Sequence, residues 1–490
     1  MIVLAADDIR KIEQRACGKG ISYLTMMENA AQSTVEAITE RVEVQGKRVV
    51  VVAGGGNNGG DGYGVARLLE NEGAFVRVLA LGEPQTETAR QERERFCSEV
   101  FEFDASYLYE ADIIVDAIFG IGLSRPVDGE YAKAINAINS SLAYTVSLDI
   151  PSGLFADSCD APLCVKADLT VSFIAHKICR VLYPAAEFFG EAVLSDIKLP
   201  RYLYEGALPI GEIIPPPVFE KRRSNTHKGN YGTLSLVCGS YGMAGAAILS
   251  TKAALKSGVG IARLSIPESI YSAVTGFVPE AVCKPYDVNG DMESVAKIAV
   301  DGASTVLIGC GLSAEGYAEQ LLRNVIKNYN GRLVIDADGL NLLSRNIECI
   351  KNSKADIVLT PHPGEMARLM GVSAEEIEKD RIGYAAALSQ KYDCTVVLKG
   401  SITVVAFGKR VYFNTTGNPS MATGGSGDVL AGIIAALCCT GMSGIDAALA
   451  AVYIHGAAGD MARDELGEIS ALPSDTLAFL PRVFKEFGER

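Results

Sequence analysis

Short apolar runs alternate with segments of helical length along almost the whole chain, and this alternation constrains the fold more than any other feature. The first series of runs covers residues 48–52, 75–81, 113–116 and 143–149. The second covers residues 232–237, 262–265, 305–308, 333–336, 357–360 and 395–398. Because alternating strands and helices imply crossover connections, the pattern predicts parallel sheets with helices on both faces.

A run of three prolines, Pro215-Pro216-Pro217, separates the two series. Three prolines cannot continue a helix or a central strand, so we place a domain boundary here, between a domain of residues 1–214 and one of residues 220–490. Two helices, around residues 7–16 and 26–42, precede the first strand. Residues 401–414 alternate like a hairpin, and residues 427–440 and 443–463 form consecutive alanine-rich helices. The apolar run 429–442 is too short to span a membrane and predicts a buried helix.

Charge and cysteine content limit the classes of partner. With 59 acidic and 45 basic residues the formal net charge is −14, which disfavours nucleic acid and acidic membranes as partners. A phosphate-bearing ligand therefore needs a local site.

The 12 cysteines are scattered without paired C-x-x-C units, which predicts reduced thiols in a cytoplasmic protein and no zinc site. The first residues have no export-signal pattern.

A glycine-rich loop, Gly54 to Gly62, follows the first strand and opens a helix. Glycines let the backbone approach a ligand, and helix N-terminal amides attract anions, so a phosphate is expected here. The spacing also matches the dinucleotide fingerprint of dehydrogenases. However, Asn57, Asn58 and Asp61 place polar oxygens in a turn that in dehydrogenases favours small residues. The alternative is a tight strand-to-helix turn without a ligand.

Two aspartates, Asp116 and Asp149, follow neighbouring strands of the same predicted sheet. The carboxyl ends of parallel strands form the usual ligand crevice of such sheets. Carboxylates beside an asparagine-rich loop can hold a hard cation, or they can act as acid and base. Either aspartate could instead simply cap the turn that follows it.

At these motifs the first 210 residues or so resemble the NAD(P)H-hydrate epimerases, which have a Rossmann-like parallel sheet. The resemblance rests on residues 56–62, 116–126 and 149–153. It implies a potassium ion held by Asn58, Asp116 and Ser152, and Asp149 as the catalytic residue beside the damaged nicotinamide ring. It also implies that nucleotide contacts come from Asn57, Asn58, Gly59, Gly60, Asp61, Gly120, Ile121, Gly122, Leu123, Ser124, Arg125, Pro126 and Tyr131.

A second glycine-rich segment, residues 418–428, leads directly into the apolar helix at Val429. A helix that begins after several glycines offers unpaired amides to an oxyanion, and the carboxylate of Asp428 can take a proton from a hydroxyl that attacks phosphorus. The simpler alternative is that Asp428 only caps the helix. No P-loop sequence occurs in the chain, so that class of phosphate-binding motif is excluded.

Other polar residues follow strands of the second series. His362 stands between two prolines, so we expect it to be fixed and to face a ligand. Lys399 ends another strand, where it could contact a phosphate or stay solvated. The glycine turn at residues 309–313 and the acidic stretch 336–341 also follow strands, and the latter could order a magnesium ion through water.

Residues 220–490 resemble the ADP/ATP-dependent NAD(P)H-hydrate dehydratases, a branch of the ribokinase-like fold. The matching segments are residues 256–260, 309–313, 336–341, 360–365, 399–403 and 418–428. The resemblance implies that Gly311, His362 and the catalytic Asp428 face the hydrate. It implies that the adenine nucleotide is bound by Lys399, Gly400, Ser401, Ile402, Thr403, Asn418, Pro419, Ser420, Met421, Ala422, Thr423, Gly424, Gly425, Ser426 and Gly427. Related sugar kinases have Thr or Ala where this chain has Ser426.

Together the two resemblances cover almost the whole chain and imply an α/β enzyme that repairs hydrated NADH and NADPH. One domain would interconvert the R and S hydrates. The other would phosphorylate the S form with ADP or ATP and magnesium, so that phosphate leaves. The alternative is a vitamin or sugar kinase fused to a non-catalytic nucleotide-binding module. The sequence does not distinguish ADP from ATP or fix the oligomeric state, for which a homo-oligomer is the expectation.

Overall fold

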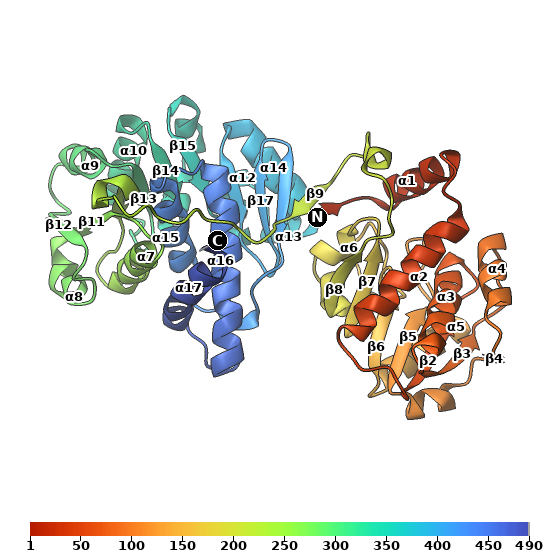
Figure 1. The fold of residues 1–490 in the computed structure, drawn as a ribbon. Coiled ribbons are helices and arrows are strands. Elements are labelled where there is room, and N and C mark those ends of the chain that lie inside the picture. Colours follow the sequence, from red (N-terminus) through yellow and green to blue (C-terminus); the bar gives the residue numbers. More distant parts are fainter. Residues whose placement is uncertain (489–490) are drawn as a thin grey trace. The chain divides into compact units, whose positions relative to one another are not determined.

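The computed structural model describes residues 1–488, and the chain divides into two compact units, Met1–Glu212 and Ile213–Arg490 (Figure 1). Residues 214–223, which include the three prolines, have no regular secondary structure. The sequence places the domain boundary between residues 214 and 220, within this irregular segment. Each unit has its own hydrophobic core.

The first unit contains a seven-stranded parallel sheet in the order β4-β3-β2-β5-β6-β7-β8. A short strand, β1, pairs antiparallel with β9. The strands are β1 (Ile2–Val3), β2 (Arg48–Ala53), β3 (Phe75–Ala80), β4 (Val100–Glu102), β5 (Ile113–Ala117), β6 (Tyr144–Leu148), β7 (Leu169–Phe173), β8 (Glu191–Ser195) and β9 (Gly211–Ile213). The helices are α1 (Ala6–Gly18), α2 (Tyr23–Thr39), α3 (Asn57–Asn71), α4 (Glu87–Arg95), α5 (Gly129–Asn139) and α6 (Ile178–Val181).

Alternate side chains of the central strand β2 enter two separate cores. Val49 and Val51 join the core formed with α1, α2 and α3, whereas Val50 and Val52 join the core under α5. A strand buried on both faces needs apolar residues at every position, which explains its run of four consecutive valines. The polar motifs lie instead in the loops that follow the strands, at the carboxyl-terminal edge of the sheet.

The second unit has a nine-stranded mixed sheet in the order β18-β17-β16-β15-β14-β13-β10-β11-β12. Its pairs are parallel except those of β17 with β16 and with β18. The strands are β10 (Thr233–Val237), β11 (Ile261–Pro267), β12 (Val282–Tyr286), β13 (Thr305–Ile308), β14 (Arg332–Ile335), β15 (Asp356–Leu359), β16 (Thr395–Leu398), β17 (Thr403–Phe407) and β18 (Arg410–Asn414).

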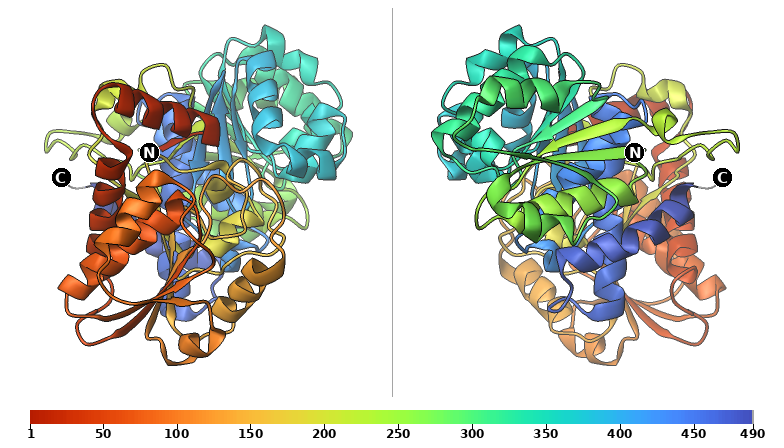
Figure 2. Two further views of the ribbon diagram at one scale, coloured as in Figure 1. Left: turned by 90° about the vertical axis from the view of Figure 1, so that its right-hand side faces the viewer. Right: turned by 90° about the vertical axis from the view of Figure 1, so that its left-hand side faces the viewer.

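Helices cover both faces of this sheet, with α7, α15, α16 and α17 on one face (Figure 2). The helices of this unit are α7 (Ala244–Lys256), α8 (Tyr271–Thr275), α9 (Met292–Val300), α10 (Gly316–Asn328), α11 (Asp338–Leu343), α12 (Pro363–Met370), α13 (Ala374–Lys379), α14 (Arg381–Tyr392), α15 (Ser426–Cys439), α16 (Gly444–Leu466) and α17 (Pro473–Gly488). Every residue of α15 from Val429 to Cys439 is buried, as predicted for the apolar run. Among residues 1–488, the structure contains no helix that is both long and apolar enough to cross a membrane.

The predicted α/β class is confirmed, and the predicted runs match the central strands of both sheets. The prediction was wrong at two functional positions, where the strand ends one residue earlier than expected. Strand β6 ends at Leu148, and Asp149 adopts a left-handed backbone with φ of 68°, whereas β14 ends at Ile335, before Asp336. Strands β1, β4, β7, β8, β9 and β12 were not predicted. The hairpin expected at residues 401–414 is present as β17 and β18.

The close packing of α15 against α7 depends on Gly432. A Cβ at this position would lie 2.3 Å from the carbonyl oxygen of Ser250 and 2.8 Å from the Cβ of Ala253. We expect Gly432→Ala to force the two helices apart and to lower the free energy of unfolding by about 1–3 kcal/mol, the usual cost of overpacking. Urea denaturation of the full chain measures this loss.

Gly245→Ala is the matched control, because a Cβ at this position of α7 would meet no atom within 4 Å. There the added methyl group should be neutral or should stabilise the helix by about 0.5–1 kcal/mol. Equal effects of the two substitutions would contradict the proposed helix contact.

Candidate functional sites

The first candidate site lies where β2, β5 and β6 end, so that three loops meet at one edge of the parallel sheet. The backbones of these loops are in close contact. A Cβ on Gly54 would lie 2.1 Å from the carbonyl oxygen of Ile118, and one on Gly59 would lie 1.8 Å from that of Gly54. Only glycine fits at these two positions, and the turn leads directly into the free amides at the start of α3.

Asp116 is completely buried in this site and belongs to strand β5. Its carboxylate accepts hydrogen bonds from the hydroxyl of Ser147 at 2.7 Å, the N–H of Ser152 at 2.9 Å and the N–H of Ile118 at 3.3 Å. Burial raises the pKa of Asp116, although these donors oppose the shift. No basic side chain among residues 1–488 forms an ion pair with it. A buried carboxylate without a cation is costly, so this position favours a cation or a proton.

Asp149 is held by a buried lysine, Lys177. The lysine ammonium group forms an ion pair with Asp149 and donates a hydrogen bond to the carbonyl oxygen of Phe173 at 3.0 Å. The other carboxylate oxygen of Asp149 is 3.3 Å from the N–H of Ile121, and its carbonyl oxygen accepts from Ser172. Sequence reasoning missed Lys177. No local pattern singles it out, because the surrounding segment, residues 173–181, also contains His176 and Arg180.

Helix α1 contributes a further titratable group, Glu13, which the sequence analysis also missed. Arg10 of the same helix donates to the carbonyl oxygen of Ile121 at 3.0 Å, which attaches α1 to the loop after β5. Burial and the negative charge of Asp149 raise the pKa of Glu13 to about 7. Burial also raises the pKa of Asp61, with further contributions from Asp149 and Glu13. Glu13 can therefore hold or release a proton near neutral pH.

The structure brings three of the predicted residues together around Gly120. A Cβ on Gly120 would lie 3.1 Å from Oδ2 of Asp149 and 3.3 Å from Oδ1 of Asn58. The side-chain amide nitrogen of Asn58 is buried without a hydrogen-bond partner. Ser152 lies close by, because its hydroxyl accepts from the N–H of Phe119 at 2.8 Å. These contacts place Asn58, Asp149 and Ser152 about the same loop.

The other predicted residues of the first site lie around its rim. Asn57 accepts a hydrogen bond from Thr86 at 2.6 Å, and Tyr131 of α5 packs on Phe119 with ring centroids 4.8 Å apart. Gly59 and Gly60 are buried at the start of α3. The turn after β5 is exposed at Gly122, Ser124, Arg125 and Pro126 and half-buried at Ile121 and Leu123.

The second candidate site centres on the start of α15. Gly425 adopts a left-handed backbone with φ of 100°, and α15 begins at Ser426 with Asp428 in its first turn. Asp428 is therefore not the capping residue of the helix. Burial, together with the charge of Asp336, raises the pKa of Asp428 to about 6. A carboxylate with this pKa is mostly charged at neutral pH and can accept a proton.

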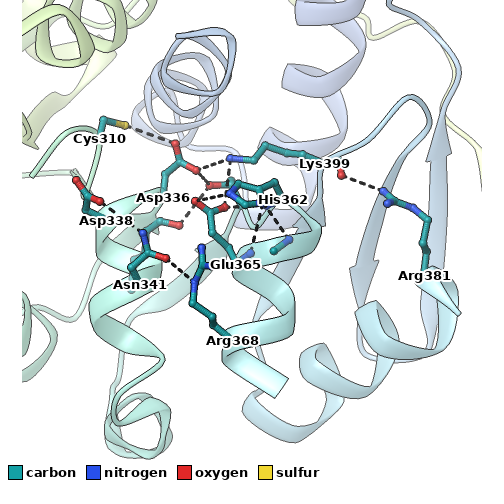
Figure 3. Close-up of polar contacts among 12 residues, drawn as sticks. Cys310, Asp336, Asp338, Asn341, His362, Glu365, Arg368, Arg381 and Lys399 are labelled. Atoms are coloured by element: carbon teal, nitrogen blue, oxygen red, sulfur yellow. Dashed lines mark hydrogen bonds and ion pairs between the residues drawn. The ribbon is translucent and has the colours of Figure 1, made fainter. Parts of the chain in front are cut away.

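Asp336 is the buried centre of the second site (Figure 3). Its carboxylate accepts from the ammonium group of Lys399 at 2.8 Å and from the hydroxyl of Thr360 at 2.7 Å. The thiol of Cys310 lies 3.7 Å from its second oxygen. Donor atoms of Cys310, Asp336 and Asp428 lie within 4.8 Å of one another, a set that could bind a divalent cation.

His362 and Glu365 are joined at the start of α12. The Nδ1 atom of His362 accepts from the N–H of Gly364 at 3.0 Å, and the carboxylate of Glu365 accepts from the N–H of His362 at 2.8 Å. This reciprocal cap fixes a histidine whose side chain is half-exposed. Burial and Lys399 lower the pKa of His362, so its ring is neutral at neutral pH. Burial raises the pKa of Glu365 to about 7.

Lys399 is not a solvated turn lysine, because its side chain is largely buried against Asp336 and Glu365. Arg381 supports the strand end by donating to the carbonyl oxygens of Leu398 and Lys399 at 3.1 and 3.0 Å. A Cβ on Gly427 would lie 3.3 Å from the ammonium nitrogen of Lys399. The lysine therefore lies beside the start of α15.

The remaining predicted residues of the second site lie on three loops. Gly311, buried in the turn after β13, has a left-handed backbone. Gly400, Ser401 and Ile402 connect β16 to β17, which begins at Thr403. Asn418, Pro419, Ser420, Met421, Ala422, Thr423 and Gly424 lead from β18 towards α15. A hollow of about 600 Å³ beside Pro419 is also lined by Gly467, Glu468, Ile469 and Ser470. These last four residues carry no recognisable sequence signal.

Family models match both units of the chain. A model described as NAD(P)H-hydrate dehydratase matches residues 234–482, and a model described as YjeF-related protein N-terminus matches residues 24–179. The first match lies within the second unit and covers half of the chain. The second match lies within the first unit.

Curated relatives match both units at once. A bifunctional NAD(P)H-hydrate repair enzyme from Thermofilum pendens is 36% identical, over 100% of this chain and 97% of its own length. Enzymes with the same description from Moorella thermoacetica and Escherichia coli are each 35% identical. These alignments cover 100% and 98% of this chain, and 98% and 93% of the relatives.

Solved structures match the second unit. The ADP/ATP-dependent NAD(P)H-hydrate dehydratase from Bacillus subtilis, co-crystallised with ATP and Mg²⁺, is 32% identical with a TM-score of 0.50. The match covers 55% of this chain and 95% of the solved chain. A ribokinase-like superfamily protein from Enterococcus faecalis is 29% identical with a TM-score of 0.50, over 55% of this chain and 93% of its own.

The buried ion pair of the first site generates a prediction about stability. Lys177→Met leaves Asp149 buried without its cation, which should lower the free energy of unfolding by about 3–5 kcal/mol. Urea denaturation of the full chain measures the change. Lys133→Met is the matched control, because Lys133 pairs with Glu130 on the surface and both side chains are about 70% exposed. If both variants lost the same small amount, Lys177 would not be supporting Asp149.

Proposed function

The chain belongs to the family of bifunctional NAD(P)H-hydrate repair enzymes, and we propose that each of its two compact units carries one of the two activities. The enzyme epimerises R- and S-NAD(P)HX, and it dehydrates the S form to NAD(P)H at the expense of ADP or ATP. The vitamin or sugar kinase considered as the alternative is not supported by relatives that match both units. We assign epimerisation to residues 1–214 and dehydration to residues 220–490.

The dehydration site must convert the ring hydroxyl of the hydrate into a better leaving group. In our proposal, the hydroxyl oxygen attacks the terminal phosphorus of ADP or ATP while its proton passes to the carboxylate of Asp428. The bond from phosphorus to the bridging oxygen breaks, and AMP or ADP is released. The phosphate ester then expels phosphate, and loss of a proton from the adjacent ring carbon restores the double bond.

The position of Asp428 is the observation that best supports this assignment. It lies in the first turn of α15, beside the glycine-rich backbone of residues 424–427, and its pKa of about 6 suits a general base at neutral pH. The amides of residues 424–427 would stabilise negative charge on the transferred phosphoryl group. Asp336 keeps Lys399 beside Gly427, where the ammonium group would attract the nucleotide phosphates.

The remaining predicted residues of the second unit would bind the two substrates. Gly311 and His362 would face the hydrate, whereas the loops at residues 399–403 and 418–427 would bind the adenine nucleotide. The hollow beside Pro419 has the volume of a small-molecule site and adjoins the second of these loops. The carboxylates of Asp336 and Asp338 provide the oxygen donors that magnesium prefers. When bound, the ion would neutralise charge on the nucleotide phosphates.

In the first unit we propose Asp149 as the group that moves a proton during epimerisation. It lies beside Gly120 in the loop expected to bind the nucleotide, and its ion pair with Lys177 holds the side chain in place. The rim residues 57–61, 120–126 and Tyr131 would bind the NAD(P)HX nucleotide. Proton transfer at the hydrated ring would allow the two configurations to exchange.

The donor set around Asp116 fits a potassium ion. Asp116 is buried and, among residues 1–488, has hydrogen-bond donors but no ion-pair partner. Asn58 and Ser152, which share the neighbouring loops, offer neutral oxygens. We infer that Asn58, Asp116 and Ser152 would hold the ion, which would supply positive charge near the bound nucleotide.

We propose a cytoplasmic location for the enzyme. All twelve cysteines of the chain are free thiols, which suits a reducing cytoplasm. The expectation of a homo-oligomer stays a prediction, as does the absence of nucleic acid and membrane partners.

Asp428→Asn tests the dehydration mechanism. The amide keeps the size of the side chain but cannot accept the proton, so dehydration of S-NADHX should fall about 10²-fold or more. Absorbance of restored NADH measures this rate with ADP or ATP and magnesium. In the unaltered enzyme kcat/KM should rise as pH increases through about 6, where Asp428 becomes charged, and should then level off.

Epimerisation by Asp428→Asn is the internal control, since it should keep the rate of the unaltered enzyme. Nucleotide binding should also survive. A variant that restored NADH at close to the normal rate would contradict the assignment of Asp428 as the base.

Substitutions in the first unit separate cation binding from proton transfer. Potassium should raise the unfolding temperature relative to sodium at equal ionic strength, because a ligand that binds only the folded state stabilises it. Asp116→Ala should abolish this increase and lower epimerisation. Asp149→Asn should keep the increase but lower epimerisation by about 10²-fold or more.

Dehydration should be normal in both variants, which makes it the control for intact folding of the second unit. Retention of the potassium effect in Asp116→Ala would show that the ion is bound elsewhere.

A further inference from the structure

Helix α16 lies against the loop that we assign to the adenine nucleotide, and Asp460 of this helix bonds to the beginning of that loop. One carboxylate oxygen of Asp460 accepts from the N–H of Gly417 at 2.9 Å, and the other accepts from the side-chain amide of Asn418 at 2.9 Å. We propose that Asp460 is a positioning residue for the nucleotide-binding loop of the dehydratase. The inference rests on the proposed function of this loop.

The orientation of Asn418 follows from its partners. A carboxylate can only accept hydrogen bonds, so the NH₂ group of Asn418 must face Asp460. The amide oxygen then faces into the loop, where it accepts from the N–H of Ser420 at 3.1 Å and from the Ser420 hydroxyl at 2.5 Å. Asp460 thus fixes the turn at residues 418–421 through Asn418, without itself belonging to the loop.

Two glycines of α16 near Asp460 allow the loop to lie directly against the helix. A Cβ on Gly456 would lie 2.2 Å from the hydroxyl oxygen of Thr416, and one on Gly459 would lie 2.2 Å from the sulfur of Met421. Thr416 also donates to the carbonyl oxygen of Tyr453 at 3.0 Å. Small residues on the helix therefore let the loop backbone approach closely while Asp460 bonds to it.

The same helix also reaches the other end of the loop. His455 lies with its Nε2 atom 3.4 Å from the hydroxyl of Ser426, the first residue of α15. Burial lowers the pKa of His455 to about 4, so this histidine is neutral and adds no charge beside the nucleotide. Helix α16 thus contacts both ends of a loop that has only a single short turn of helix of its own, at Pro419–Met421.

Asp460→Asn tests the role of the carboxylate, because an amide cannot accept from both donors at once. The nucleotide KM should rise by about tenfold, the equivalent of one lost charged hydrogen bond, while the KM for S-NADHX should stay within about twofold of normal. Glu465→Gln is the matched control. It removes one negative charge from the same helix at an exposed residue whose partner is Arg482, which makes no ion pair with Asp460, and it should leave both constants unchanged.

A reciprocal exchange separates positioning from a general loss of stability. Asn418→Asp alone should also raise the nucleotide KM, because two carboxylates would then face each other. In the double variant Asp460→Asn, Asn418→Asp, the amide at position 460 can accept from Gly417 and donate to the carboxylate at position 418. The nucleotide KM should then return to within about threefold of normal, as expected for two directly coupled residues.

A normal nucleotide KM in Asp460→Asn would overturn the proposal, even if its unfolding temperature were lower. If that variant did not fold, the double variant would decide alone: a near-normal KM would support the proposal, and a raised KM would overturn it. Failure of the proposed function would look different, because the unaltered chain would then consume neither ADP nor ATP in the presence of S-NADHX.

Discussion

Buried carboxylates at the ends of parallel strands are the constraint on which both sites depend. Removing a carboxylate from water is unfavourable unless donors or a cation replace the water. Asp116 is stabilised by the donors of Ser147, Ser152 and Ile118, whereas Asp336 is stabilised by Lys399 and Thr360. The loops around each site are arranged to supply these partners, which explains why they contact one another so closely.

Most of the fold could be predicted from the sequence because the central strands are continuously apolar. The strands that it failed to indicate have mixed composition. In β7, Thr170 and Ser172 are buried, and their hydroxyls donate hydrogen bonds to the carbonyl oxygens of Phe189 and Asp149. A strand with alternating polar residues is therefore buried, although its composition does not indicate this. In the edge strand β12, Pro285 interrupts the usual strand signal. Local composition therefore predicts central strands better than strands that use side-chain hydrogen bonds or lie at an edge.

Some site residues could be predicted from local sequence patterns, and others could not. Glycine-rich loops and strand-end aspartates have local signatures, so the sequence pattern alone is enough to single out Asn58, Asp149 and Asp428 as candidates. Lys177, Glu13 and Asp460 have no such signature, because each acts on a residue distant in the sequence and lies within an ordinary helix or next to one. Their roles depend on the packing of helices against the sheet, and this packing determines which loop each side chain reaches.

Both sites place a carboxylate that pairs with a lysine beside a second carboxyl group, but the group proposed to move the proton is the paired one in the first unit and the second one in the second unit. In the first unit Lys177 pairs with Asp149, and burial together with the charge of Asp149 raises the pKa of Glu13 to about 7 and also raises the pKa of Asp61. In the second unit Asp336 takes the lysine, and the pKa of the neighbouring Asp428 is raised to about 6. In each case burial is the main cause of the raised pKa, and the charge of the carboxylate that pairs with the lysine adds to it. The lysine itself opposes this rise, because its positive charge lowers the pKa of the second carboxyl group in both sites. The raised pKa therefore depends on burial and on the negative charge of the paired carboxylate.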